Sequence, residues 1–116
     1  MRIETQKAVD ALLDGKNIKL ARTTVEGDCL MLHGNVIAKV TRFEFGGIKQ
    51  IEMTLAGWPT PTTRERLNGL IQTWAQRMTG TYTKAWFSQR KGKQYFTDVL
   101  GNTHEIEPYE AVIIDY

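Results

Sequence analysis

The chain has few of the residues from which recognisable active sites are built. Its 116 residues include one cysteine and two histidines. Neither His33 nor His104 has a second ligand at the spacing of a metal motif. The sequence contains no glycine-rich phosphate loop, no Gly-x-Ser-x-Gly elbow and no carboxylate pair that could be assigned to glycoside hydrolysis. We therefore expect neither an enzyme nor a cofactor or metal site.

A single cysteine cannot form an internal disulfide, which favours a reducing cytoplasm. Cys29 lies in an apolar run, so we expect a buried and unreactive thiol. No apolar run approaches the roughly 18–20 residues that a transmembrane helix needs. The first residues carry no secretory signal. These absences predict a cytoplasmic protein that makes no contact with membranes.

The composition, 41% apolar and 24% charged, is that of an ordinary globular protein, and its length suits one domain over residues 1–116. The net charge of +2 is unevenly distributed. Residues 60–95 carry seven basic groups and one acidic group, whereas residues 96–116 carry five acidic groups and no basic one. Either this uneven charge steers an acidic partner to the basic middle segment, or it is neutralised when the basic and acidic segments pair in the fold.

The apolar pattern predicts a helix over residues 3–14, with Gly15 as its stop. Strands are then expected over residues 18–25, 29–33, 36–40 and 48–55, with turns at Gly34-Asn35 and Gly46-Gly47. A second helix is predicted from residue 63 to about residue 78. Its apolar stripe comprises Leu67, Leu70, Ile71, Trp74 and Met78.

Thr62 and Glu65 have the spacing of a capping box at the start of this second helix, and Gly80 is placed to end it. A hairpin around residues 90–92 and a last strand over residues 111–114 should follow. The expected fold class is α+β: an antiparallel meander, with the N-terminal helix and the central amphipathic helix packed on one face.

The segment that enters the second helix has the chemistry of an anion pocket. Helix-start amides, hydroxyls and guanidinium groups bind phosphate or carboxylate. The candidate residues are Trp58, Thr60, Thr62, Thr63, Arg64 and Arg66. The alternative is a well-capped helix with no ligand. A cap explains Arg64 least, and under either hypothesis we expect its replacement by alanine to leave stability nearly unchanged.

Basic and aromatic residues alternate along the later hairpin, a composition that suits single-stranded nucleic acid. The candidate residues are Lys84, Trp86, Arg90, Lys91, Lys93 and Tyr95. The alternative is an amphipathic hairpin with one ring of each adjacent pair in the core and with lysines that protect its edges.

Two ordered motifs carry a resemblance. They are Leu32-His33-Gly34-Asn35-x-Ile37-Ala38 and Leu55-Ala56-Gly57-Trp58-x-Thr60-x-Thr62-Thr63-x-x-Arg66-Leu67-Asn68-x-Leu70. Across roughly residues 28–100 the chain resembles small bacteriophage proteins of unassigned activity. This resemblance implies a phage origin and action in the host cytoplasm.

The leading hypothesis is a non-enzymatic phage accessory protein that binds and modulates a host or anti-phage defence protein, as anti-CRISPR inhibitors do. The alternative is a phage protein that binds DNA or RNA through residues 84–96. The sequence leaves open the partner, the oligomeric state and the binding face.

Overall fold

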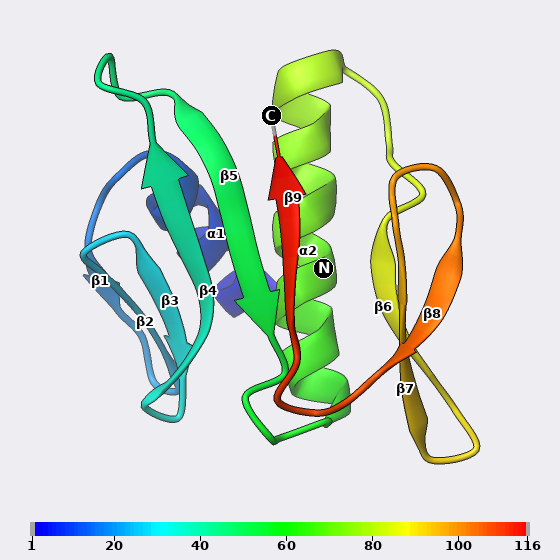
Figure 1. Cartoon of the computed structure of the whole chain (residues 1–116). Helices are drawn as coiled ribbons and strands as arrows, with labels where there is room; N and C mark the ends of the chain where they lie inside the picture. Colours follow the sequence, from blue (N-terminus) through cyan, green and yellow to red (C-terminus); the bar gives the residue numbers. More distant parts are fainter. Residues whose placement is uncertain (1, 116) are drawn as a thin grey trace.

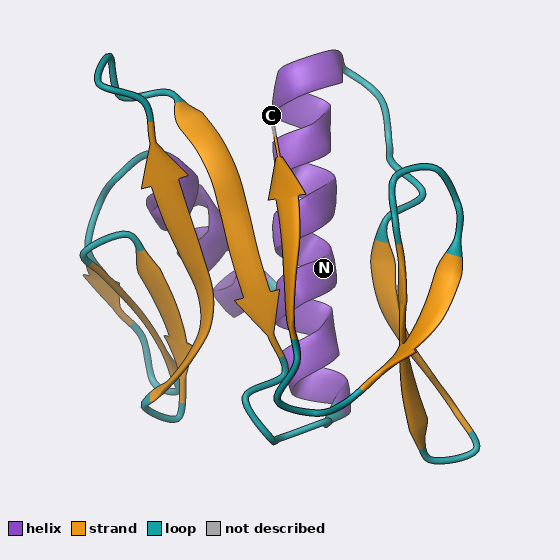
Figure 2. Ribbon diagram, in the orientation of Figure 1, coloured by secondary structure: helices purple, strands orange, loops and turns teal. Residues whose placement is uncertain are grey.

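The computed structural model describes residues 2–115 as an α+β fold of two helices and two antiparallel sheets (Figure 1; Figure 2). This is the fold class that the sequence predicts. In chain order the elements are α1 (Ile3–Leu13), β1 (Ile18–Lys19), β2 (Thr23–Glu26), β3 (Cys29–Leu32), β4 (Asn35–Arg42), β5 (Ile48–Thr54), α2 (Pro61–Thr79), β6 (Trp86–Arg90), β7 (Lys93–Thr97), β8 (Thr103–Ile106) and β9 (Ala111–Asp115).

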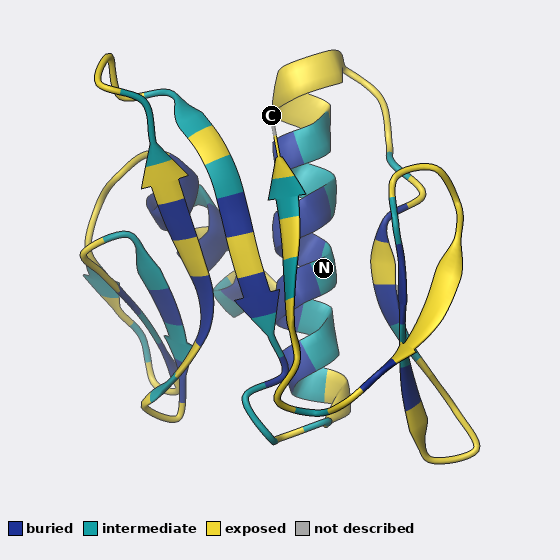
Figure 3. Ribbon diagram, in the orientation of Figure 1, coloured by how far each residue is buried: buried dark blue, intermediate teal, exposed yellow. Residues whose placement is uncertain are grey.

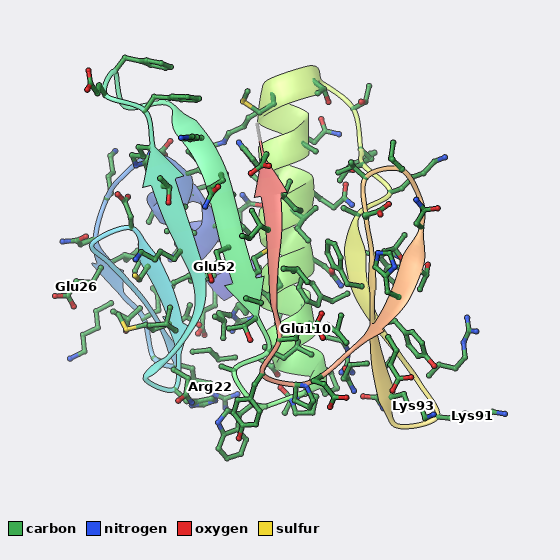
Figure 4. The ribbon with its side chains drawn as sticks, viewed as in Figure 1. Arg22, Glu26, Glu52, Lys91, Lys93 and Glu110 are labelled. Atoms are coloured by element: carbon green, nitrogen blue, oxygen red, sulfur yellow. The ribbon has the colours of Figure 1, made fainter. Side chains whose placement is uncertain are left out.

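The larger sheet has the strand order β1-β2-β3-β4-β5-β9, and both helices lie on one of its faces (Figure 1). Buried and exposed residues alternate along β5 and, from Ala38 onward, along β4, as a sheet covered on one side requires (Figure 3). Ile51 and Met53 of β5 are buried, whereas Glu52 between them is exposed (Figure 4). The strands predicted over residues 29–33, 36–40 and 48–55 and the last strand, over residues 111–114, are confirmed.

Two local predictions for this sheet are wrong. The strand expected over residues 18–25 is a hairpin of β1 and β2, in which Ile18 lies opposite Val25. The turn expected at Gly34-Asn35 lies one residue earlier. His33 and Gly34 have φ values of 53° and 80°, the two positive angles of a type I′ turn, and Asn35 already pairs with Leu32.

The smaller sheet, β6-β7-β8, lies beside α2 and was not expected as a separate sheet (Figure 1). Its inner residues Phe87, Phe96 and Ile106 belong to the same buried cluster as Leu67 and Leu70 of α2. Strand β8 was missed because three of its four residues are exposed and polar, which leaves no alternating apolar signal.

Helix α2 begins earlier than predicted, and its cap is a different threonine. Thr60 is the N-cap, with an extended backbone and a hydroxyl that accepts from the Thr63 amide at 3.2 Å. Pro61 occupies the first helical position, where a missing N–H costs nothing. The expected Thr62–Glu65 capping box is therefore wrong. Gly80 ends the helix in the left-handed conformation, as predicted.

Two expectations about burial are also corrected. Met78 was assigned to the apolar stripe of α2, yet it is 45% exposed, while the other four stripe residues are buried. Cys29 was expected to be buried, but it is only partly buried at the start of β3. No helix within residues 2–115 is long and apolar enough to cross a membrane.

Candidate functional site

The two sequence motifs, separated along the chain, meet at one cavity of about 380 Å³ between the β3–β4 turn and the entry to α2. Buried apolar side chains form part of its lining and polar side chains form the rest. The lining residues are Leu32, His33, Asn35, Ile37, Leu55, Trp58, Thr60, Thr62 and Thr63. Four of these residues, Trp58, Thr60, Thr62 and Thr63, were among the predicted binding residues.

The β3–β4 turn contributes residues that sequence reasoning did not nominate for binding. His33 sits within the turn in the left-handed conformation, and Asn35 follows as the first residue of β4. Leu32 and Ile37 flank them with buried side chains. Their presence in the first motif was a signal, but that motif predicted only a hairpin turn and a family resemblance, and no binding residue.

Trp58 is held on a tight turn. The Trp58 amide donates to the Leu55 carbonyl at 2.9 Å, and the two residues between, Ala56 and Gly57, both have positive φ. The ring of Tyr109 covers Gly57, where an added Cβ would lie 2.5 Å from a ring carbon. The Gly57 amide also donates to the Pro108 carbonyl at 2.9 Å. This anchored turn presents a tryptophan that is 60% exposed.

The three threonines play different parts. The hydroxyls of Thr60 and Thr63 lie 3.0 Å apart, and Thr60 also caps the helix, so both are occupied within the fold. The Thr62 hydroxyl has no hydrogen-bond partner among residues 2–115 and lines the cavity. Of the three, Thr62 is therefore the one available to a bound molecule.

Arg66 does not reach this cavity, because its side chain is buried beneath α1. The residue is 1% exposed, and its guanidinium pairs with Glu65 at 2.6 Å and with Glu4 at 3.2 Å. The hydroxyls of Thr5 and Thr23 accept further hydrogen bonds from it, at 2.5 and 3.1 Å. The hydrogen bond from Thr23 and the charge of Arg66 hold the pKa of Glu4 below its usual value. Arg66 was predicted to bind a partner or an anion, but its charge is instead paired inside the fold.

Arg64 instead joins α2 to the smaller sheet. Its Nη1 lies 2.9 Å from the Oε1 atoms of both Gln89 and Gln94 and 3.1 Å from the Pro59 carbonyl oxygen. Partial burial lowers the pKa of this guanidinium. These contacts give Arg64 a structural role that a helix cap alone did not suggest. Without Arg64 and Arg66, the cavity has no arginine to hold an anion.

The basic hairpin forms a separate surface. Strand alternation puts Trp86 and Arg90 of β6 on the same face as Lys93 and Tyr95 of β7, because Phe87 and Phe96 turn inward. The Arg90 guanidinium lies 5.9 Å from the centre of the Tyr95 ring. Lys91 and Lys93 project from the tip of the hairpin (Figure 4).

Lys84 lies apart from the hairpin face, in the wall of a second groove beside the C-terminal half of α2. No ion pair among residues 2–115 joins the basic segment 60–95 to the acidic segment 96–116. Arg66 and Arg77 pair with acidic residues of their own segment or of the first 14 residues instead. Within the same described range, no group of three histidine, cysteine, aspartate or glutamate side chains could hold a metal ion.

Comparison with known proteins adds one finding. A family model described as Kyanoviridae Gp96 protein matches residues 1–110, which includes the cavity, the hairpin and both helices. No curated protein and no solved structure matches the chain.

Proposed function

Because the chain belongs to the Kyanoviridae Gp96 family of phage proteins, we propose that it is a non-enzymatic accessory protein that binds and modulates a protein of the host cell or of its anti-phage defences. The site of action is then the host cytoplasm. The observation that carries the proposal is the exposed Trp58, held on a hydrogen-bonded turn at a cavity with apolar and polar walls.

Protein interfaces concentrate their binding energy in a few aromatic or arginine anchors that fill pockets. The cavity around Trp58 has the matching composition. Leu32, Ile37 and Leu55 supply apolar surface, while His33 and Thr62 supply polar groups. A fixed turn also lowers the entropy lost when the tryptophan is ordered against a partner. We infer that a partner side chain enters the cavity while Trp58 packs against the partner's surface.

The test is affinity capture from nuclease-treated host extract with the wild-type chain and two matched variants. Trp58→Ala removes the proposed anchor. Trp86→Ala is the control, because Trp86 is 49% exposed on the other sheet. We expect the wild type and the control to retain the same partner, and Trp58→Ala to weaken it by at least about thirtyfold, the loss typical of an interface hot spot. Equal capture by all three proteins would refute the proposal.

A second candidate function is binding of single-stranded DNA or RNA by the β6–β7 face. The observation that favours it is the shared orientation of Trp86, Tyr95, Arg90 and Lys93, two rings and two cations on one face. Rings stack on bases, and cations follow the phosphates. Glu105 of β8 weakens the case, because it lies opposite Tyr95 and repels phosphate.

This alternative predicts a different pattern of loss. Binding of a fluorescent oligonucleotide at low salt should disappear in Arg90→Ala/Lys93→Ala and should fall steeply as salt rises. It should be unchanged in Trp58→Ala. An oligonucleotide that does not bind at low salt would exclude the nucleic-acid hypothesis and leave protein binding as the function to pursue.

A further inference from the structure

Strand β9 leaves one side of its backbone open. It pairs with β5 on one side and is the last strand of the larger sheet as described over residues 2–115. An open edge presents a row of unpaired main-chain N–H and C=O groups. The outer edge of β6, by contrast, is covered. Asn68 and Gln72 of α2 form hydrogen bonds to the main chain of β6 and of the segment before it. No described residue closes the edge of β9 in this way.

A groove of about 590 Å³ runs beside this open edge. Helix α2 extends past the edge of β9 and borders the groove (Figure 1). The segment between α2 and β6, together with Val99, also borders it. The lining residues are Ile71, Trp74, Ala75, Met78, Thr79, Thr81, Tyr82, Thr83, Lys84, Val99, Ile114 and Asp115.

Apolar side chains of the groove are left in contact with solvent. Met78, Val99 and Tyr82 are 45%, 55% and 77% exposed. Trp74 is 7% exposed, yet its indole N–H has no hydrogen-bond partner within the described part of the chain. Buried N–H groups are normally paired, so this donor is left unsatisfied at a residue that lines the groove.

We propose that an extended segment of another protein adds to β9 as a seventh strand and fills the groove. Main-chain bonds to an open edge give affinity, and alternate side chains entering the groove give selectivity. Lys84 and Asp115 both border the groove, so it carries no excess charge of one sign. The partner is therefore a segment whose inward residues are apolar and uncharged, at a spacing of two.

A second copy of this chain does not fit the same edge. If two β9 strands paired symmetrically, the second sheet would bring its own α2 past its own edge. Because α2 lies on one face of the sheet and extends past the edge of β9, the helix of the second copy would come to the same place, and the two helices would collide (Figure 1). A lone extended segment carries no such helix. The groove shares no lining residue with the cavity at Trp58, so loss of binding at one site is distinguishable from loss at the other.

The experiment uses a displayed library of segments of about eight residues, in which alternate positions are drawn from Val, Ile, Leu, Phe and Met. Selection is carried out on the full chain, and the enriched segments are synthesised for affinity measurement in solution. Met78→Lys places a charge in the groove at an exposed helix position. Val36→Lys is the matched control, because Val36 is 44% exposed on β4, away from the groove.

We expect Met78→Lys to weaken the selected peptides at least about tenfold, because a charge would be buried against apolar side chains. Val36→Lys and Trp58→Ala should change their affinity less than about twofold, as surface substitutions outside the site do. N-methylation of every second residue gives two versions of each peptide, and only one of them blocks the N–H groups that face β9. That version should lose binding, and the other should keep it. Hydrogen exchange should show new protection at β9.

Three results would overturn the proposal. One is a library that yields no segment competing for the groove. Another is binding that Met78→Lys and Val36→Lys affect equally, or that protects amides other than those of β9. The last is concentration-dependent self-association of the free chain that protects β9, which would assign the edge to a second copy.

Discussion

The side chain of Asn68 pairs with the main chain of Phe87 in both directions. The Phe87 amide donates to Oδ1 at 2.7 Å, and Nδ2 donates to the Phe87 carbonyl at 3.0 Å. One turn later, Gln72 makes the same two-way contact with Thr83, at 3.0 and 3.2 Å. Arg64, one turn earlier, bonds to Gln89 and Gln94. A polar row on α2 thus fastens the smaller sheet to the helix.

Replacing Asn68 with alanine should destabilise the protein by about 1–3 kcal/mol, because the N–H and C=O of Phe87 lose their partners at a part-buried site. Gln76→Ala is the control, since Gln76 is exposed on the same helix and its side chain makes no hydrogen bond within residues 2–115. Urea unfolding measures both variants. If the two variants unfold at the same urea concentration, the polar row does not hold the sheet.

Removing the buried cation at Arg66 should lower the free energy of unfolding more than replacing Asn68 does. Arg66→Met leaves Glu4 and Glu65 without their shared partner, and breaking a buried ion pair from one side costs about 3–5 kcal/mol. Both carboxylates are about one-quarter exposed, so the lower end of that range is expected. Lys7→Ala, at an exposed position of α1, should change the free energy of unfolding by less than about 0.5 kcal/mol. A loss of under about 1 kcal/mol in Arg66→Met would contradict this account.

The lowered pKa of Glu4 predicts how stability depends on pH. A carboxyl whose pKa is lower in the folded state than in the unfolded state stabilises the fold while it is ionised. That contribution is fully present above the unfolded pKa, about 4.3, and is lost as the pH falls through the lower folded value. The free energy of unfolding should therefore decrease below about pH 4.3. Glu4→Gln should be less stable at pH 7 and should lose part of this acid dependence, whereas an unchanged acid slope would count against the role of Glu4.

Gly57 should tolerate a side chain less well than Gly80, although their φ values of 79° and 76° are nearly equal. Nothing lies within 4 Å of a Cβ built on Gly80, so Gly80→Ala carries only the cost of the left-handed backbone, about 1–2 kcal/mol. Gly57→Ala also displaces the Tyr109 ring and should cost more. In a Tyr109→Ala background, the cost of Gly57→Ala should fall to that of Gly80→Ala. Thermal unfolding of the four variants and the parent tests this, and an additive double variant would show that the ring does not restrict residue 57.

Sequence reasoning succeeded where the signal is local. The stripe from Leu67 to Trp74 has the period of a helix, and Gly80 adopts the left-handed cap that ends it. The β6–β7 hairpin was likewise predicted, around residues 90–92, and its turn at Lys91 and Gly92 has the two positive φ values of a tight hairpin. Sequence reasoning failed at Thr62. Thr60 and Thr62 are both plausible caps, and Pro61 at the first helical position makes Thr60 the N-cap.

The sequence by itself determined the α+β class, both helices, most strands and the two motifs, because periodicity and turn chemistry act over a few residues. Only the tertiary structure decided what the polar residues of α2 do. Arg64, Asn68 and Gln72 have the spacing of a solvent-facing row, yet they dock a second sheet. It also brought His33 and Trp58 to one cavity and left β9 as an open edge beside an apolar groove. Those relations depend on contacts between residues far apart in the chain, which no local pattern records.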